Sequence, residues 1–239
     1  MNGFRNEYEF CKIFDDKFIY QLDEKYIKFL EDIYEKELDR KAYVICWKQR
    51  FNNKVDIVIS IGKDKKYISI KSGKNNSIHL EGLDSFVSFL KELEVYDDVI
   101  EIYINYHIGN DENGNRISGK EYQEQHPEEL KKLNMFLNKK ENVERAITRF
   151  LFQGRNNEDK MIDAMIYGTP ENFMYATRKQ IYNYLLLQQD EFIAPHFSLL
   201  VMQPWTRNLN LNPKYENRRD FVQVKWYRLD EHFKKIHCE

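Results

Sequence analysis

An aspartate and a lysine stand on two neighbouring stretches of alternating apolar residues. Asp56 lies near the start of Lys54-Val-Asp-Ile-Val-Ile-Ser-Ile-Gly, and Lys71 lies near the end of Lys66-Tyr-Ile-Ser-Ile-Lys-Ser-Gly. This alternation predicts two strands, and the loop with Gly62 is short enough to fold one back on the other. A carboxylate holds a hard cation such as Mg²⁺, and an ammonium orients water or stabilises charge on phosphorus. The pair therefore indicates a metal-dependent phosphodiesterase.

The two strands resemble the PD-(D/E)xK nuclease superfamily, the fold of many restriction and repair nucleases, over roughly residues 4–107. The resemblance implies an α/β restriction endonuclease-like core, with a central mixed sheet flanked by helices and a helical insertion. It implies that Asp56 is the first acid of the motif and Lys71 its lysine. Ser69 stands two residues before the lysine, where the family usually has Asp or Glu. The chain therefore resembles an SxK variant.

The resemblance implies further carboxylates at the metal site. In some restriction enzymes of the SxK type the missing acid comes from the following helix, and Glu81 stands ten residues after Lys71 at an expected helix start. Many members also carry a glutamate on an opening helix. Glu7 is preferred to Glu9 for that role, because helical spacing places it over Phe10 and Phe14.

Each assignment has a simpler explanation. Asp56 and Lys71 could be solvent-facing residues at a sheet edge, although their joint occurrence on consecutive strands favours function. Glu81 and Glu7 could instead be acidic residues near expected helix starts, a position that the helix dipole favours. Ser69 reads as a spacer on its strand.

A polar loop, Ser72-Gly-Lys-Asn-Asn-Ser-Ile-His, connects the lysine strand to the expected helix. Its backbone N–H groups and side chains could meet a DNA phosphate, which assigns contacts to Lys74, Asn75 and Asn76. The alternative is an ordinary connection with Ser77 as the helix N-cap.

A second nucleic-acid signal lies between two expected strands, Phe197–Met202 and Phe221–Trp226. The connecting segment 203–220 combines aromatic, basic and asparagine side chains, which contact bases and phosphates in many complexes. The alternative is a surface loop whose arginines pair with neighbouring acids. The DNA contacts assigned here are Trp205, Arg207, Asn208, Lys214, Arg218 and Arg219.

The expected elements follow the order of the superfamily core. Helices are predicted near residues 4–14, 21–38 and 82–93, and strands at 42–48 and 99–107 in addition to the two motif strands. Residues 108–153 read as a helical insertion, and Thr177 with Gln180 forms a capping box before another helix. Three segments follow: 1–107 as nuclease core, 108–190 as helical subdomain, and 191–239 as C-terminal strands with the DNA loop, packed on the core.

Composition bounds the remaining classes. The 239 residues are 42% hydrophobic and 15% aromatic, enough for a sizeable core, and a net charge of −2 argues against indiscriminate nucleic-acid binding. The three cysteines show no zinc or disulfide spacing. No stretch approaches the roughly 20 apolar residues that span a bilayer, and the polar start is no signal peptide, so a cytoplasmic protein without membrane attachment is expected.

These observations predict a Mg²⁺-dependent endonuclease of double-stranded DNA, resembling type II restriction enzymes, with Mn²⁺ as a substitute cation and no small-molecule cofactor. Cutting two strands requires two sites, so a homodimer is expected, with the helices of residues 118–153 as its interface; a monomeric nickase stays open. The alternatives are an inactive nuclease-fold protein that binds DNA or RNA, a structure-specific repair nuclease, and an α/β interaction protein.

Overall fold

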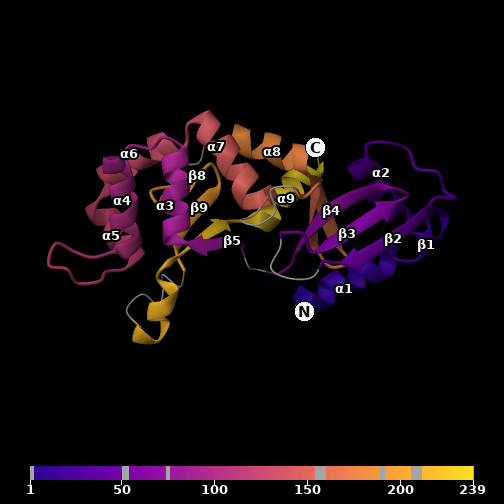
Figure 1. Ribbon diagram of the computed structural model, residues 1–239, viewed down its shortest axis with the longest axis horizontal. Helices are drawn as coiled ribbons and strands as arrows, with labels where there is room; N and C mark the ends of the chain where they lie inside the picture. The colour runs from indigo at the N-terminus through magenta and orange to yellow at the C-terminus, as the bar shows by residue number, and fades with distance from the viewer. Residues whose placement is uncertain are drawn as a thin grey trace. The chain divides into compact units, whose positions relative to one another are not determined.

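The described residues form two β-sheets (Figure 1). The computed structural model describes residues 3–49, 54–73, 76–153, 160–188, 192–205 and 212–238. The chain divides into two compact units. The first unit comprises Met1–Asn75, Leu151–Tyr184 and Arg228–Glu239, and the second unit comprises Asn76–Phe150 and Leu185–Tyr227. This division differs from the three consecutive segments expected from the sequence, because both units draw on distant parts of the chain.

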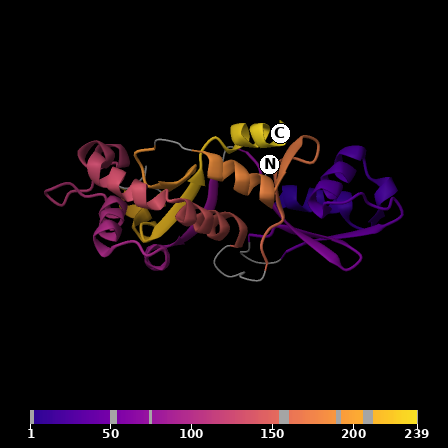
Figure 2. The same cartoon turned by 90° about the horizontal axis from the view of Figure 1, so that it is seen from above.

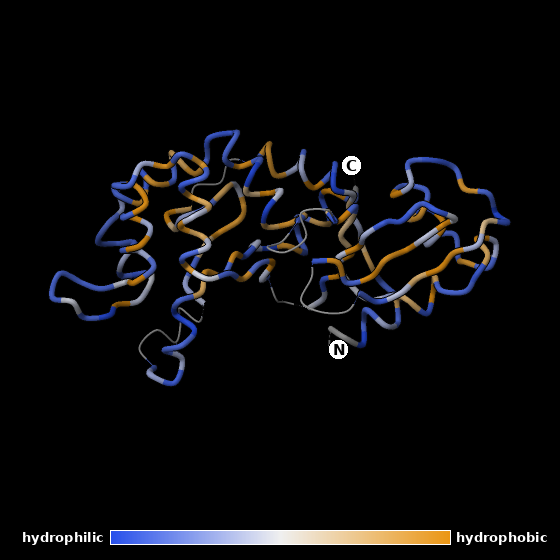
Figure 3. The backbone as a smooth tube through the Cα atoms, in the orientation of Figure 1, coloured by the Kyte–Doolittle hydropathy of each residue, from blue (hydrophilic) through white to orange (hydrophobic). Residues whose placement is uncertain are grey.

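The first unit contains a mixed six-stranded sheet, here called sheet A, in the order β1-β2-β3-β4-β6-β7. Only β4 and β6 pair in parallel; the other neighbours are antiparallel. Figure 3 shows hydrophobic residues running along these strands. The strands are β1 (Lys17–Phe18), β2 (Tyr43–Lys48), β3 (Ile57–Ile61), β4 (Asp64–Lys71), β6 (Ala164–Gly168) and β7 (Phe173–Thr177).

One face of sheet A forms a core with helices α1 (Gly3–Phe14) and α2 (Glu24–Tyr34), which follows the short 3-10 helix η1 (Ile19–Gln21). Alternate strand residues such as Val44 and Ile59 are fully buried there. Helix α9 (Leu229–Cys238) packs beside β7, as Figure 2 shows. The predicted strands at 42–48, 54–61 and 66–71 and the two predicted N-terminal helices are thus confirmed.

The second unit contains an antiparallel four-stranded sheet, sheet B, in the order β5-β10-β9-β8. Its strands are β5 (Ser77–Gly82), β10 (Phe221–Trp226), β9 (Leu200–Pro204) and β8 (His196–Phe197). Helices of the same unit pack on it, including α3 (Leu83–Glu92) and α4 (Asp97–Ile108). The other helical segments among the described residues are α5 (Gly119–Gln125), α6 (Pro127–Leu137), α7 (Lys140–Ile147), the π-helix η2 (Thr148–Gln153), α8 (Arg178–Leu187) and the 3-10 helix η4 (Pro213–Arg218).

Two predicted elements are wrong in type. The segment expected to start a helix, residues 77–81, is strand β5, because it pairs with the distant strand β10. The segment expected as a strand, residues 99–107, lies in helix α4. Its β-branched and aromatic residues favour a strand, but acidic residues in its first turn and Gly109 in a left-handed conformation at φ 69° are helix start and stop signals.

The segment 108–190, expected to be helical, contains a β-hairpin. Helices α5, α6, α7 and α8 confirm much of the expectation, and the capping box holds, since Thr177 and Gln180 exchange hydrogen bonds. Strands β6 and β7, however, complete sheet A. Gly168, the last residue of β6 before the turn to β7, is at φ 124°, and a Cβ there would lie 2.3 Å from the Asn172 carbonyl oxygen. Among the described helices none is long and apolar enough to cross a membrane.

Candidate active site

Asp56 is fixed at the entry to strand β3. Its backbone N–H donates to the Ile68 carbonyl at 2.9 Å, and its carbonyl accepts from the Gln49 N–H at 3.0 Å, so both neighbouring strands hold it. Its side-chain Oδ2 accepts hydrogen bonds from the Ile70 backbone N–H at 2.6 Å and from Ser69 Oγ at 3.1 Å. Both of these bonds end on Oδ2, so with respect to the described residues Oδ1 is the carboxylate oxygen that can face a ligand.

Burial raises the pKa of the Asp56 carboxyl above its usual value. The positive charge of Lys71 and the Ile70 N–H act in the opposite direction, Glu7 adds a further upward shift, and Ser69 lowers the pKa. Three of the residues expected to share a site, Asp56, Lys71 and Glu7, therefore act on one another in the first unit, whereas Glu81 is not among the groups that shift the Asp56 pKa. A buried carboxylate beside a second acid and a lysine is an arrangement that a cation would stabilise.

Ser69 occupies the position of the second acid and is buried, with 2% of its surface exposed. It lies on β4 opposite Met165 of β6, and it points to the same side of the strand as Lys71, two residues on. Its hydroxyl donates to Asp56, so it orients the first acid instead of adding another. This is a more specific contact than the spacer expected from the sequence.

Glu7, and not Glu9, faces this part of the first unit. The Glu7 side chain is 16% exposed and its Oε2 lies 2.6 Å from the Lys48 ammonium. The Glu9 side chain is 38% exposed and lies near Lys12. The orientation agrees with the helical spacing, while a metal-binding role for Glu7 stays a prediction. The sequence did not predict a role for Lys48, which ends strand β2. The only indication of such a role was its position two residues after Cys46 on a core strand.

Glu81 lies on strand β5 in the second unit and its side chain is fully buried. Arg149 Nη2 donates to its Oε2 at 2.7 Å, Ser85 Oγ donates to the same oxygen at 2.7 Å, and His79 Nε2 lies 3.5 Å from Oε1. Burial alone would raise the pKa of Glu81, but these three partners hold it at about 2. Arg149, which the sequence did not indicate, therefore neutralises this carboxylate; a role for Glu81 as metal ligand stays a prediction.

Part of the DNA-contact assignment can be located. Trp205, Tyr215 and Arg218 form a stack: the Arg218 guanidinium lies 4.6 Å from the Trp205 ring and 5.2 Å from the Tyr215 ring. Lys214 is exposed and lies 5.9 Å from the Tyr215 ring. We call these four residues the aromatic-arginine cluster. Stacked aromatic and guanidinium groups are common contacts for nucleic acids.

The other assigned DNA contacts do not join this cluster. Arg219 has a side chain only 14% exposed and lies 3.3 Å from Glu216. The Asn76 carbonyl accepts from the Trp226 N–H at 2.9 Å, which ties it to strand β10. The remaining positions lie outside the described residues: Lys74, Asn75, Arg207 and Asn208.

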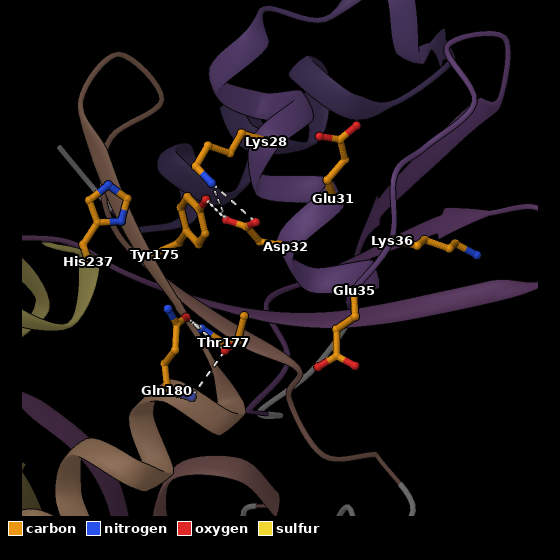
Figure 4. Close-up of a pocket in the computed structure, with 9 residues that line it drawn as sticks. All are labelled: Lys28, Glu31, Asp32, Glu35, Lys36, Tyr175, Thr177, Gln180 and His237. Atoms are coloured by element: carbon orange, nitrogen blue, oxygen red, sulfur yellow. Dashed lines mark hydrogen bonds and ion pairs between the residues drawn. The ribbon is translucent and has the colours of Figure 1, made fainter. Parts of the chain in front are cut away.

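A separate hollow of about 790 Å³ lies in the first unit, between residues of α2, β7, α8 and α9 (Figure 4). Asp32 faces Lys28 and accepts a hydrogen bond from Tyr175. The rest of the lining is Glu31, Glu35, Lys36, Thr177, Gln180 and His237. None of the predicted site residues lines it. Within the described ranges, no group of three or more His, Cys, Asp or Glu side chains is arranged to hold a metal ion.

The six-stranded mixed sheet flanked by helices is a restriction endonuclease-like α/β fold. A solved structure with this fold is similar to the chain: restriction endonuclease MspI in complex with its cognate DNA, at 13% sequence identity and a TM-score of 0.58. The match covers 92% of this chain and 87% of MspI. No family model and no curated protein sequence matches. The likeness confirms the predicted fold class.

Proposed function

We propose that the protein is a Mg²⁺-dependent endonuclease that hydrolyses phosphodiester bonds of double-stranded DNA, as a sequence-specific type II restriction enzyme. One observation carries the proposal: the Asp56 carboxylate is held by the Ile70 N–H and Ser69 on the strand that ends in Lys71. The fold similarity to a restriction endonuclease bound to DNA supports it.

The residues present suit a hard divalent cation. Asp56 offers Oδ1, and its raised pKa reflects a burial cost for the negative charge that a cation would offset. Mg²⁺ typically takes one or two protein carboxylates and completes its shell with water and phosphate oxygens, so Asp56 with Glu7 suffices as a protein contribution. When bound, Mg²⁺ would screen the phosphate and make its bound water a stronger nucleophile.

The chain's own residues supply orientation and charge. Lys71 lies on β4 near Asp56, where its ammonium orients the attacking water and stabilises negative charge developing on phosphorus. Ser69 and the Ile70 N–H fix the Asp56 carboxylate in one direction. Glu7, braced by Lys48, contributes a second carboxylate. Glu81 already pairs with Arg149. Its role as a further metal ligand therefore requires that a Glu81 substitution weaken metal binding.

The aromatic-arginine cluster supports DNA as the substrate. It places two cations, Lys214 and Arg218, beside two aromatic rings on the second unit. Cations meet phosphates, and rings stack on bases or sugars. Cutting both strands of a duplex requires two active sites, so we propose a homodimer, with helices α5, α6 and α7 as its interface.

The serine at the second-acid position favours one alternative: a nuclease-fold protein that binds DNA without cutting it. Digestion of a large phage genome with purified protein and Mg²⁺, followed by sequencing of the fragment ends, separates the two. Discrete ends at one short sequence are expected for a restriction enzyme. Random ends would point to a repair or processing nuclease. Intact DNA would favour the alternative that the protein binds DNA without cutting it.

A further inference from the structure

Strand β10 presents two different faces. Val222, Val224 and Trp226 are fully buried, whereas Phe221 is 36% exposed and Gln223 and Lys225 are half-buried. The half-buried side of β10 carries polar groups, whereas its residues on the opposite side are apolar. An alternation of this kind places one face of a strand in the core and the other toward solvent or a ligand.

The residues paired with this side of β10 extend the same face across sheet B. Gln223 is opposite Gln203 of β9 and Leu80 of β5. Lys225 is opposite Val201 of β9 and, after a bulge that follows Val224, opposite Ser77 of β5. Directly opposite residues on neighbouring strands project to the same side, and Ser77 is placed on this side by its hydrogen bond with Gln223. Leu80 is 39% exposed, whereas Val201 and Gln203 are buried. We call this set the polar sheet face: Ser77, Leu80, Gln203, Phe221, Gln223 and Lys225.

A row of hydrogen bonds fixes the central amide of the polar sheet face. Gln203 Nε2 donates to Gln223 Oε1 at 3.3 Å, and Gln223 Nε2 donates to Ser77 Oγ at 3.0 Å. Tyr227 in turn donates to Gln203 Oε1 at 3.1 Å. A glutamine amide has two N–H donors and two acceptor lone pairs. Within the described part of the chain, one N–H donor and one acceptor lone pair of the Gln223 amide are therefore not used, and its neighbours set the orientation of the amide.

Charge favours a polyanion on the polar sheet face. None of its residues is acidic, and its one charged group is Lys225, whose ammonium lies 5.9 Å from the Tyr227 ring. Burial lowers the pKa of Lys225, so the lysine carries a desolvation cost that an anionic ligand would offset.

The polar sheet face continues into the aromatic-arginine cluster. The centroids of the Phe221 and Trp205 rings lie 5.8 Å apart, and the two ring planes make an angle of 79°. The Trp205 ring also contacts the Arg218 guanidinium. The two surfaces therefore meet within the second unit. A base-reading amide beside phosphate-binding cations is the combination that specific DNA recognition requires.

We propose that the polar sheet face reads double-stranded DNA, with Gln223 contacting a base edge and Lys225 a phosphate. The paired donor and acceptor of a glutamine match adenine N7 and N6 in the major groove, and sheets serve as readers in several DNA-binding proteins. The inference rests on the proposed function in taking duplex DNA as the ligand.

A binding selection from a pool of randomised DNA duplexes tests the inference without cleavage, since EDTA removes divalent cations. Wild type, Gln223→Ala and Gln223→Met are compared, and Gln188→Ala, directly after α8, is the matched control. Thermal melting confirms that each variant folds. The expected result is a motif selected by wild type and Gln188→Ala, with preference lost at one base pair in both Gln223 variants. Lys225→Ala should weaken binding to all duplexes alike and lower the salt slope by about one, unlike the control Lys91→Ala at an exposed site on α3.

The inference is overturned if wild type selects no motif, or if both Gln223 variants select the wild-type motif as strongly as wild type does. Its failure is distinct from failure of the nuclease proposal. If the protein selects a motif through Gln223 but leaves DNA intact with Mg²⁺, the endonuclease proposal is wrong and the proposal that the polar sheet face reads DNA still holds.

Discussion

Ser69 Oγ donates a hydrogen bond to Asp56 Oδ2 at 3.1 Å, across two neighbouring strands of sheet A. Ser69, which stands in place of the expected second acid, is thus hydrogen-bonded to the first acid, Asp56. Together with the Ile70 N–H at 2.6 Å, it holds one carboxylate oxygen, and the other oxygen is the one that would bind the cation in the proposed function. The serine therefore has a positioning role that the absence of an acid does not by itself suggest.

Replacing Ser69 with alanine should weaken metal binding without abolishing it. The Asp56 carboxylate would keep the Ile70 N–H but lose the hydroxyl, which is worth about 1 kcal/mol, or roughly a fivefold change in affinity. Titration calorimetry with Mn²⁺ measures the change. Ser88→Ala, at an exposed site on α3, is the control and should bind Mn²⁺ as wild type does. Equal affinity in Ser69→Ala would remove the positioning role.

The pKa of Asp56 should move in opposite directions in two variants. Lys71→Met removes the charge that lowers the Asp56 pKa, so the pKa should rise; Glu7→Gln removes a charge that raises it, so the pKa should fall. Carboxyl ¹³C NMR titration of the metal-free protein reports both, with Asp56→Asn to assign the signal. Because only the deprotonated carboxylate holds a cation, metal binding should fail at higher pH in Lys71→Met than in wild type. Shifts of the same sign would show that the three groups do not share a site.

The Glu81–Arg149 pair should stabilise the second unit. Arg149→Met would leave a fully buried carboxylate without its cation, and breaking such a pair typically lowers the free energy of unfolding by about 3 kcal/mol. Urea unfolding at neutral pH measures it. Glu81→Gln combined with Arg149→Met should recover part of the loss, because no buried charge then remains. A single Arg149→Met variant as stable as wild type would contradict the prediction.

The same pair gives a pH dependence with a defined sign. The folded-state pKa of Glu81 is about 2, below the ordinary value of 4.5. Its contribution is therefore fully present above about pH 4.5 and is lost as the pH falls toward 2. The free energy of unfolding of wild type should fall through that range more steeply than that of Glu81→Gln. Parallel curves would show that Glu81 is not specifically stabilised in its charged form.

Arg218→Ala should weaken binding to every DNA sequence. The guanidinium stacks on Trp205 and Tyr215, so its loss removes a cation and loosens two rings. The expected loss is about tenfold, since stacked contacts of this kind contribute about 1–3 kcal/mol. Fluorescence anisotropy with a labelled duplex measures it. Arg40→Ala, which removes an exposed pair with Glu24 in the first unit, is the control. Unchanged affinity in Arg218→Ala would remove the cluster from the DNA surface.

Local patterns predicted the part of the fold that they determine. The alternation around Asp56 and Lys71 predicts a hairpin because both strands and their turn are contiguous, and Gly62 adopts φ 61° in that turn. Helical spacing distinguishes Glu7 from Glu9 for the same reason. Both features depend on residues that lie close to one another along the chain.

Contacts between distant parts of the chain account for what the sequence did not predict. Glu81 lies in a strand because it pairs with Val222, far along the chain. The partner Arg149 and the β6 strand beside β4 likewise come from distant segments. For helix α4, the residue types of 99–107 favoured a strand, but the buried positions Val99, Tyr103 and Tyr106 have helical spacing, and the terminal signals agree with it.

Plasmid cleavage with Mg²⁺ by wild type, Asp56→Asn and Lys71→Met tests the central claim most directly. The account predicts that wild type converts supercoiled DNA to defined fragments, that EDTA stops it, and that each variant loses cleavage by at least about a hundredfold, in line with loss of a transition-state charge stabiliser. Thermal melting and DNA binding equal to wild type would show that both variants are folded. Cleavage that persists in Asp56→Asn, or intact plasmid with wild type and Mg²⁺, would contradict the account.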